Sequence, residues 1–295
     1  MLELLTTLTG AMLAAIAVLY LRGWLRLRRR GAGFASLARL GVFGFATLTV
    51  AGVFLTPMNW LNQDYLFVRV AQYVFFCLLA APAFFIACTF DVTPWGLPSA
   101  ARRRFRRWTR EPHGMPQLLR RATQPWLTVL FFLSIFVIWN DVRVVDWTLA
   151  HPALHMALLL ALGAAAMLVW WHIVGTGPRL HTEFSPWLAA VALLLMELTN
   201  MVTGVTIAFA QEPIYAHYAA ALQESARWLP LTAADDQALG GGLLWVVGSA
   251  VYVSSVVLVL NRLFERHRAD RPEPLPQWDD DERMIMPGLE HRLRK

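Results

Sequence analysis

The sequence predicts an all-α polytopic membrane protein, a bundle of about seven transmembrane helices. Three observations predict this fold class: the composition, a series of long apolar runs, and the placement of arginine between those runs. Hydrophobic residues make up 57% of the 295 positions and charged residues only 16%, whereas a soluble domain carries about 25% charged residues. This balance excludes a disordered chain and argues against a soluble globule. Two cysteines are too few for a disulfide scaffold.

Seven apolar stretches come close to the length of about 20 residues that a helix needs to cross a bilayer. The predicted spans are residues 3–21, 40–57, 66–89, 125–140, 152–174, 187–210 and 239–260. The first is a span rather than a cleaved signal peptide, because its basic residues follow the apolar run instead of preceding it. The fourth is short if it ends at Trp139 and longer if Val142, Val144 and Val145 belong to it.

Arginine placement predicts the orientation of the bundle. The loops after the first and third spans and the start of the C-terminal tail are arginine-rich, whereas residues 58–65, 141–150 and 211–238 hold more acids than arginines. Basic residues stay on the cytoplasmic side, so we expect the N-terminus outside and the C-terminus inside, as seven spans require. Basic clusters beside a membrane attract anionic lipid, so lipid, and not nucleic acid, is the expected partner of these loops.

The chain divides into one membrane domain and a tail. Residues 1–262 are predicted to form a single seven-helix transmembrane domain. Residues 263–295 are rich in Pro, Asp, Glu and Arg, a composition typical of a flexible segment. We therefore predict a flexible cytoplasmic tail.

Polar and ionisable residues inside spans are costly, so each is a functional hypothesis. Their spacing along the chain and their depth in the membrane indicate which of them can lie together. In the third span Arg69, Tyr73 and Cys77 are four residues apart and share a helix face. At a rise of about 1.5 Å per residue, the residues expected near the outer surface are Arg69, Asp141, His151, His155 and Asp236. The full set is Arg69, Gln72, Tyr73, Cys77, Asp141, His151, His155, Glu197, Asn200, Asp236 and Gln237.

Each of these residues also has a structural interpretation. His151 and His155, at i and i+4, can bind a metal ion or haem, or can sit hydrated at a helix end. Arg69 is either an anchor that reaches the outer surface or a paired cation. A carboxylate in the middle of a span, such as Glu197, pairs or stays protonated, so we expect it to have a partner.

Four collinear segments resemble the CtaG-type cytochrome c oxidase assembly factors, seven-span bacterial membrane proteins linked to copper insertion into the oxidase. They are YLFVRVAQYVFFCLLAAP at 65–82, HPALHMALLLALGAAAMLVWW at 151–171, IAFAQEPIYAHY at 207–218 and DDQALGGGLLWVVGSAVY at 235–252. The resemblance implies a non-enzymatic assembly or maturation factor for a haem-copper oxidase, in the bacterial plasma (inner) membrane. Its partners would be oxidase subunits. It would act at the outer face, in copper delivery or as a contact chaperone.

The sequence departs from the family's histidine pattern. The family's third-span block usually has histidines on both sides of a glutamine, and here Arg69 and Tyr73 flank Gln72. A third histidine of the fifth-span block is replaced by Leu159. His151, His155, Asp236 and Gln237 carry over.

Two hypotheses follow from these departures. In the first, copper binds His151 and His155, with Cys77 as an added soft ligand. In the second, Arg69 replaces the metal and pairs with Asp236 or Asp141, and the protein is a metal-free member that acts by contact.

Two other functions fit the polar residues. Glu197 and Asn200, with Thr203 and Thr206, would line a path for a small cation or proton in a carrier or channel. His151 and His155, or His172, would serve as axial ligands in a haem-binding membrane redox protein. The sequence has no CxxCH motif, which excludes only covalently attached c-type haem.

Overall fold

The computed structural model describes residues 2–31, 33, 35–110, 121–177, 184–224 and 229–269. Every regular element in these ranges is a helix, which confirms the all-α fold. Six helices are long and apolar enough to cross a membrane, and the count reaches seven if the bent pair α9 (Pro125–Asn140) and α10 (Val142–Ala150) is one span. The prediction of about seven membrane helices is therefore confirmed.

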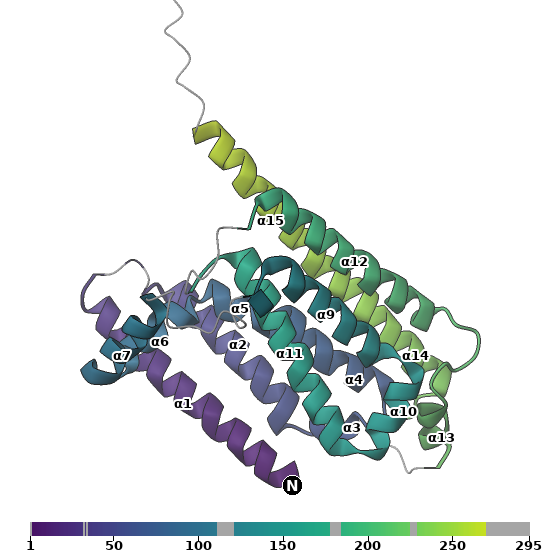
Figure 1. The fold of residues 1–295 in the computed structure, drawn as a ribbon. Helices are drawn as coiled ribbons and strands as arrows, with labels where there is room; N and C mark the ends of the chain where they lie inside the picture. Colours follow the sequence, from purple (N-terminus) through teal and green to yellow (C-terminus); the bar gives the residue numbers. More distant parts are fainter. Residues whose placement is uncertain are drawn as a thin grey trace, which may run out of the picture.

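The long helices pack side by side in a bundle (Figure 1). Besides α9 and α10, they are α1 (Leu2–Arg28), α2 (Leu37–Leu55), α3 (Met58–Leu61), α4 (Leu66–Tyr73), η1 (Val74–Ala80), α5 (Ala81–Ile86), α6 (Thr89–Gly96), α7 (Ser99–Arg110), α11 (Pro152–Val174), α12 (Pro186–Ala208), α13 (Ala216–Glu224), α14 (Ala233–Gly242), η3 (Leu243–Val247) and α15 (Gly248–Ala269).

The third span lies at the centre of the bundle. It is the continuous helix Leu66–Ile86, made of α4, the π-helical stretch η1 and α5. Of its most apolar window 78% is buried, against 22–39% for the other five single spans. A π-helical stretch redirects backbone carbonyls and is often found at functional sites. Here the indole of Trp170 donates to the Cys77 carbonyl at 2.9 Å and ties α11 to η1.

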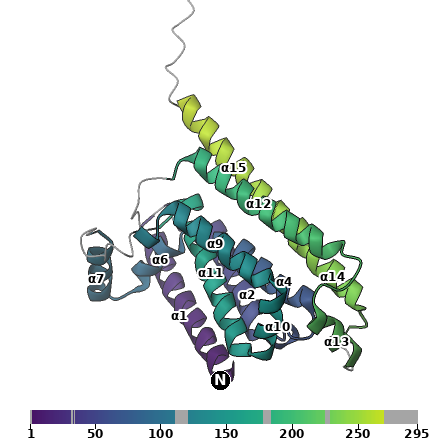
Figure 2. The ribbon, with the colours of Figure 1, turned by 45° about the vertical axis from the view of Figure 1, so that its right-hand side comes forward.

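The two ends of the bundle are built differently (Figures 1 and 2). The short helices α3, α10 and α13 gather at one end, which we call the α3–α10–α13 end, and the start of α1 lies near it. Helices α6 and α7 lie at the opposite end, and α15 projects beyond the bundle there. The two ends of the described chain thus lie at opposite ends of the bundle, as an odd number of spans requires; which end faces the cytoplasm stays a prediction.

Glycines fix the contact between α1 and α6. A Cβ atom added to Gly23 would lie 2.2 Å from the carbonyl oxygen of Val92, and one added to Gly96 would lie 2.0 Å from that of Leu19. Only residues without a side chain allow two backbones to approach this closely. The α1–α6 crossing therefore depends on these two glycines.

The structure confirms the predicted end of the fourth span at residue 140 and extends the last helix beyond its predicted end. The fourth span ends at Asn140, and the chain bends by 72° before α10. The reason is Asp141, whose side chain accepts from the backbone N–H groups of Arg143 and Val144 and so starts a new helix. The last helix continues to Ala269, past the predicted domain boundary at residue 262. The remainder of the predicted tail, residues 270–295, lies outside the described residues.

Candidate functional site

Arg69 is the centre of a buried polar network at the α3–α10–α13 end. Its side chain is 1% exposed. One terminal nitrogen, Nη1, lies 2.8 Å from Nδ1 of His155 and 3.4 Å from the hydroxyl of Thr148. The other, Nη2, donates to the Trp139 carbonyl at 3.1 Å, and the guanidinium carbon lies 3.9 Å from the centre of the Trp139 ring. Four helices, α4, α9, α10 and α11, therefore converge on one cation.

The hydrogen bonds fix the state of His155. A guanidinium has donors and no acceptor, so Nδ1 of His155 must accept from Arg69. The proton of the neutral ring then sits on Nε2, which donates to Oε1 of Gln72 at 3.2 Å. The Gln72 amide nitrogen donates in turn to the Met58 carbonyl at 3.1 Å. The result is a directed chain in which both ring nitrogens of His155 are engaged.

Two tyrosines from the segment after α12 pack beside the Arg69 network. Tyr215 donates to the Asn140 carbonyl at 2.9 Å and Tyr218 to the Asn62 carbonyl at 2.8 Å. Burial raises the pKa of Tyr215 to about 12 and raises the pKa of Tyr218, while the nearby Arg69 charge lowers both by less. Both tyrosines are therefore neutral donors that shield the Arg69 network.

Asp236 and Gln237 connect the last span to this end of the bundle. Asp236 is buried and accepts from the backbone N–H groups of Leu66 at 2.8 Å and Phe67 at 3.1 Å. It thereby satisfies two of the free N–H groups at the start of α4. Gln237 accepts from the backbone N–H of Ile214 at 2.7 Å. These two side chains therefore connect α14 to the start of α4 and to the segment after α12.

The predicted ion pair of Arg69 with Asp236 or Asp141 is not what the structure shows. Both carboxylates cap helices, Asp236 at α4 and Asp141 at α10. The partners of Arg69 are an imidazole, a hydroxyl and a carbonyl. The prediction was wrong because helix starts with free N–H groups compete for the same carboxylates.

His151 and His155 are separated, although the i, i+4 spacing predicted a shared face. His151 precedes the first helical residue of α11, has backbone angles of −133° and 82°, and is exposed. Its Nδ1 lies 3.0 Å from the Trp147 carbonyl. The signal was present in the sequence, since a residue before proline avoids the helical region and Pro152 follows His151.

The structure does not assemble the predicted copper ligands. Cys77 is fully buried in η1, His155 is engaged at both nitrogens, and Nδ1 of His151 contacts the Trp147 carbonyl of α10. Within the described ranges, no three His, Cys, Asp or Glu side chains gather as a metal site would need. The residues present therefore do not fit a copper ion.

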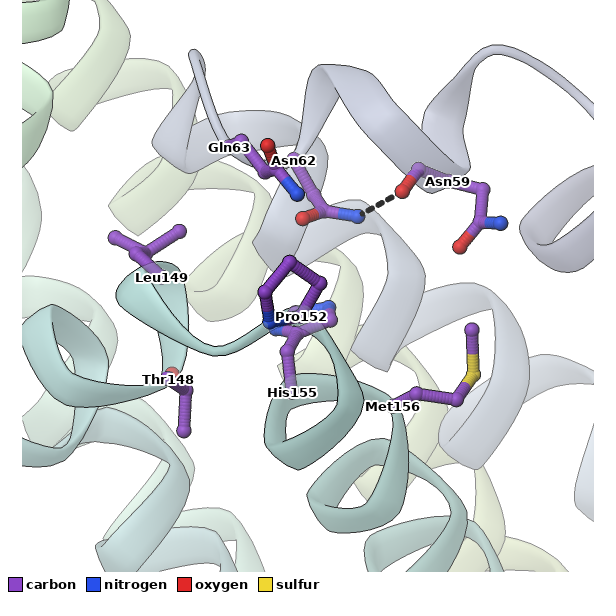
Figure 3. Close-up of a pocket in the computed structure, with 8 residues that line it drawn as sticks. All are labelled: Asn59, Asn62, Gln63, Thr148, Leu149, Pro152, His155 and Met156. Carbon is purple, nitrogen blue, oxygen red and sulfur yellow. Dashed lines mark hydrogen bonds between the residues drawn. The ribbon is translucent and has the colours of Figure 1, made fainter. Parts of the chain in front are cut away.

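A small pocket lies beside the network (Figure 3). It has room for about one water molecule. His155 and Thr148, both neighbours of Arg69, line it, so the network is reached from this pocket. The lining residues are Asn59, Asn62, Gln63, Thr148, Leu149, Pro152, His155 and Met156.

A second polar group lies between α12 and α15. Ser249 donates to Oε1 of Glu197, and the amide nitrogen of Asn200 donates to the Leu244 carbonyl at 2.9 Å. Oε2 of Glu197 and Oδ1 of Asn200 are buried and have no hydrogen-bond partner among the described residues. The expected partner of Glu197 is thus Ser249, but two acceptor oxygens remain unsatisfied.

Tyr73 does not take part in the Arg69 network. Its hydroxyl lies 3.3 Å from that of Tyr252 on α15, and its ring packs on Phe136. It therefore points to the last span, away from its predicted role beside Arg69.

Sequence reasoning missed four residues of the network: Trp139, Thr148, Tyr215 and Tyr218. Trp139 lies in a predicted span and Thr148 in the predicted loop 141–150, and nothing in their spacing marks them. Tyr215 and Tyr218 lie at the end of the segment 207–218, whose resemblance to a family was the available signal.

The fold and this network define a multi-pass helical membrane protein with a closed polar cluster at one end of its bundle. A family model described as cytochrome c oxidase caa3 assembly factor (Caa3_CtaG) matches residues 18–266. The chain therefore belongs to this family of oxidase assembly factors. Searches of curated proteins and of solved structures gave no match.

Proposed function

We propose that this chain assists the assembly of a haem-copper cytochrome c oxidase as a contact chaperone that holds no copper and catalyses no reaction. Family membership supports the assembly role. The observation that carries the metal-free part is the Arg69–His155 contact of 2.8 Å. We place the protein in the bacterial inner membrane, with the α3–α10–α13 end outside, from its arginine distribution.

The chemistry of His155 supports the metal-free proposal. A metal binds the lone pair of a neutral imidazole nitrogen, and Arg69 occupies the only lone pair of the ring. The guanidinium also supplies a fixed positive charge where a cation would sit. Copper would have to displace a buried arginine and overcome its repulsion.

The α3–α10–α13 end offers a surface for an oxidase subunit. Trp147 of α10 is 58% exposed, and tryptophan is enriched in protein contacts. The ring of His151 packs against it at 6.0 Å between ring centres. Trp147 thus stands on a helix that the Arg69 network holds in place through Thr148.

A deletion strain complemented with variants tests this function. We expect the deletion to lower haem-copper oxidase activity and oxidase copper content, wild type to restore both, and Trp147→Ala to restore them only in part. Trp187→Ala, a tryptophan with similar exposure (59%) on α12, serves as the matched control and should restore both. Unchanged oxidase in the deletion strain would refute the assembly role, and full rescue by Trp147→Ala would refute the contact surface.

A second candidate function rests on the two unsatisfied oxygens of Glu197 and Asn200. Buried oxygens need a partner: a proton on Glu197 would make its carboxyl a donor, and a small cation would bind the oxygens directly. The candidate is a proton or cation carrier. In liposomes with an internal pH dye, the wild-type protein should then carry protons and Glu197→Gln should not; absence of transport by the wild type would exclude it.

The same geometry does not favour His151 and His155 as a pair of axial haem ligands. Axial ligation needs a free imidazole nitrogen, and those of His155 are engaged. A visible absorption spectrum of the purified protein tests this point directly.

A further inference from the structure

A cluster of arginines surrounds one tryptophan at the end of the bundle opposite the Arg69 network. Arg30, just after α1, and Arg102, on α7, both lie over the ring of Trp95 on α6. Their guanidinium carbons are 5.3 and 4.9 Å from the ring centre. The two charges are therefore at most about 10 Å apart, which is close to the Debye length at 0.1 M salt. We call Arg30, Trp95 and Arg102 the Trp95 cluster.

The cluster is held on rigid elements. Nη1 of Arg26 lies 2.6 Å from the Trp95 carbonyl and 3.1 Å from the Leu97 carbonyl, which ties α1 to the chain after α6. The glycine contacts of α1 with α6 fix the same pair of helices. The fold thus holds the Trp95 ring close to both Arg30 and Arg102.

Among the residues that the structure describes, no carboxylate contacts the arginines of the cluster. The side-chain contacts of Arg30 and Arg102 within the described part of the chain are with the indole ring. Arg26 adds a third cation next to them. Like charges at this separation repel each other, so an anion between them would stabilise the arrangement.

The position of the cluster selects the kind of anion. The first span ends at Arg28 and the third at Ile86. Arg30 follows the first span by two residues, and Trp95 lies on α6, the short helix that follows the third span and packs against α1. Tryptophan and arginine are both favoured at the headgroup level. The last turns of α1 expose Leu21 by 43% and Leu25 by 49%, an apolar surface suited to acyl chains.

We propose that the Trp95 cluster binds the phosphate group of an anionic phospholipid. Arginine stacked on an aromatic ring keeps its N–H edge free, and that edge matches phosphate oxygens in paired hydrogen bonds. The same phosphate chemistry would fit inorganic phosphate, but the span ends and the exposed leucines favour the lipid.

Lipid binding by the full-length protein tests the proposal. The probes are mixed micelles of phosphatidylglycerol or phosphatidylcholine, with inorganic phosphate as a soluble competitor, and bound lipid is counted by native mass spectrometry. We expect a preference for phosphatidylglycerol. A basic residue near a charged membrane surface contributes an affinity factor of about five, so Arg30→Gln and Arg102→Gln should each weaken binding about fivefold, and the double variant about 25-fold.

Control variants distinguish binding at the Trp95 cluster from a general attraction of anionic lipid to positive charge. Arg143→Gln removes an exposed arginine of α10 and should leave binding unchanged. Arg30→Lys with Arg102→Lys keeps the charge and should recover part of the affinity. Thermal unfolding in lipid-free detergent checks that each variant is folded.

Three results would overturn the proposal. They are wild-type affinity in the folded double variant, equal binding of phosphatidylcholine, and displacement of the lipid by inorganic phosphate at equal concentration. The last result would assign the cluster to a soluble phosphate.

Discussion

Arg69 donates to Nδ1 of His155 across 2.8 Å, and both side chains are at least 95% buried. Each residue determines the state of the other. The guanidinium makes His155 an acceptor at Nδ1, and the neutral ring gives the buried cation a partner. This pair explains how the network closes without a carboxylate partner for Arg69.

Removal of the guanidinium should destabilise the protein. Arg69→Met leaves the Trp139 carbonyl and Nδ1 of His155 without donors in a buried site, and an unsatisfied buried group costs about 1–3 kcal/mol. We expect the free energy of unfolding in detergent, measured by denaturant titration, to fall by about that amount for each unsatisfied group. His151→Ala is the control, because an exposed side chain should change it by less than about 0.5 kcal/mol. Equal stability of Arg69→Met and wild type would show that the network is not structural.

The capping role of Asp236 makes a second prediction. Asp236→Ala frees the N–H groups of Leu66 and Phe67, and loss of a cap costs about 1–2 kcal/mol. Asp236→Asn keeps an acceptor and should cost less. Hydrogen exchange should also quicken at the start of α4. Asp146→Ala, an exposed acid on α10, should leave both measurements unchanged; the same loss in that variant would mean that the effect is one of charge.

The α1–α6 crossing gives a prediction about packing. Gly96→Ala places a Cβ 2.0 Å from the Leu19 carbonyl oxygen, so the helices must separate, at a cost of about 1–3 kcal/mol. A Cβ added at Gly41, which lies in a helix, has no other atom within 4 Å. Gly41→Ala should therefore leave the stability unchanged or raise it by up to about 1 kcal/mol. Thermal unfolding of the two variants side by side decides the matter, and equal losses would contradict the close contact.

The raised pKa of Tyr215 predicts that the protein loses stability in alkaline solution. Its pKa is about 12 in the folded protein, because of burial, against 10.0 for a free tyrosine. The folded state thus holds the proton more tightly, and its stabilising contribution is complete below pH 10 and lost as the pH rises towards 12. The difference in melting temperature between wild type and Tyr215→Phe should shrink over this range. A constant difference from pH 8 to pH 11.5 would contradict the burial of a neutral hydroxyl.

The membrane helices could be predicted because hydropathy and length act locally. A run such as 152–174 must be helical in a bilayer, where each backbone group needs a partner, and the structure has α11 at Pro152–Val174. The helix break at Asp141 does not follow from hydropathy, since Val142, Val144 and Val145 continue the apolar pattern. An aspartate that caps the next helix decides it, and a hydropathy window does not weigh that contact.

The site was predicted in part. The sequence marked Arg69, Gln72 and His155 by their cost in a membrane, and the structure brings these three together. The sequence alone could not identify the partners of Arg69, because Trp139 and Thr148 contribute a carbonyl and a hydroxyl that many other residues could offer. The pairing depends on how four helices cross.

The copper content of the purified protein tests the central claim most directly. Wild type and His151→Ala/His155→Ala are loaded with Cu(I) under reducing conditions, desalted, and analysed for copper per protein. Because Arg69 occupies the lone pair of His155, we predict far less than one copper per chain and the same value for both proteins. One copper per wild-type chain, lost in the double variant, would contradict the account.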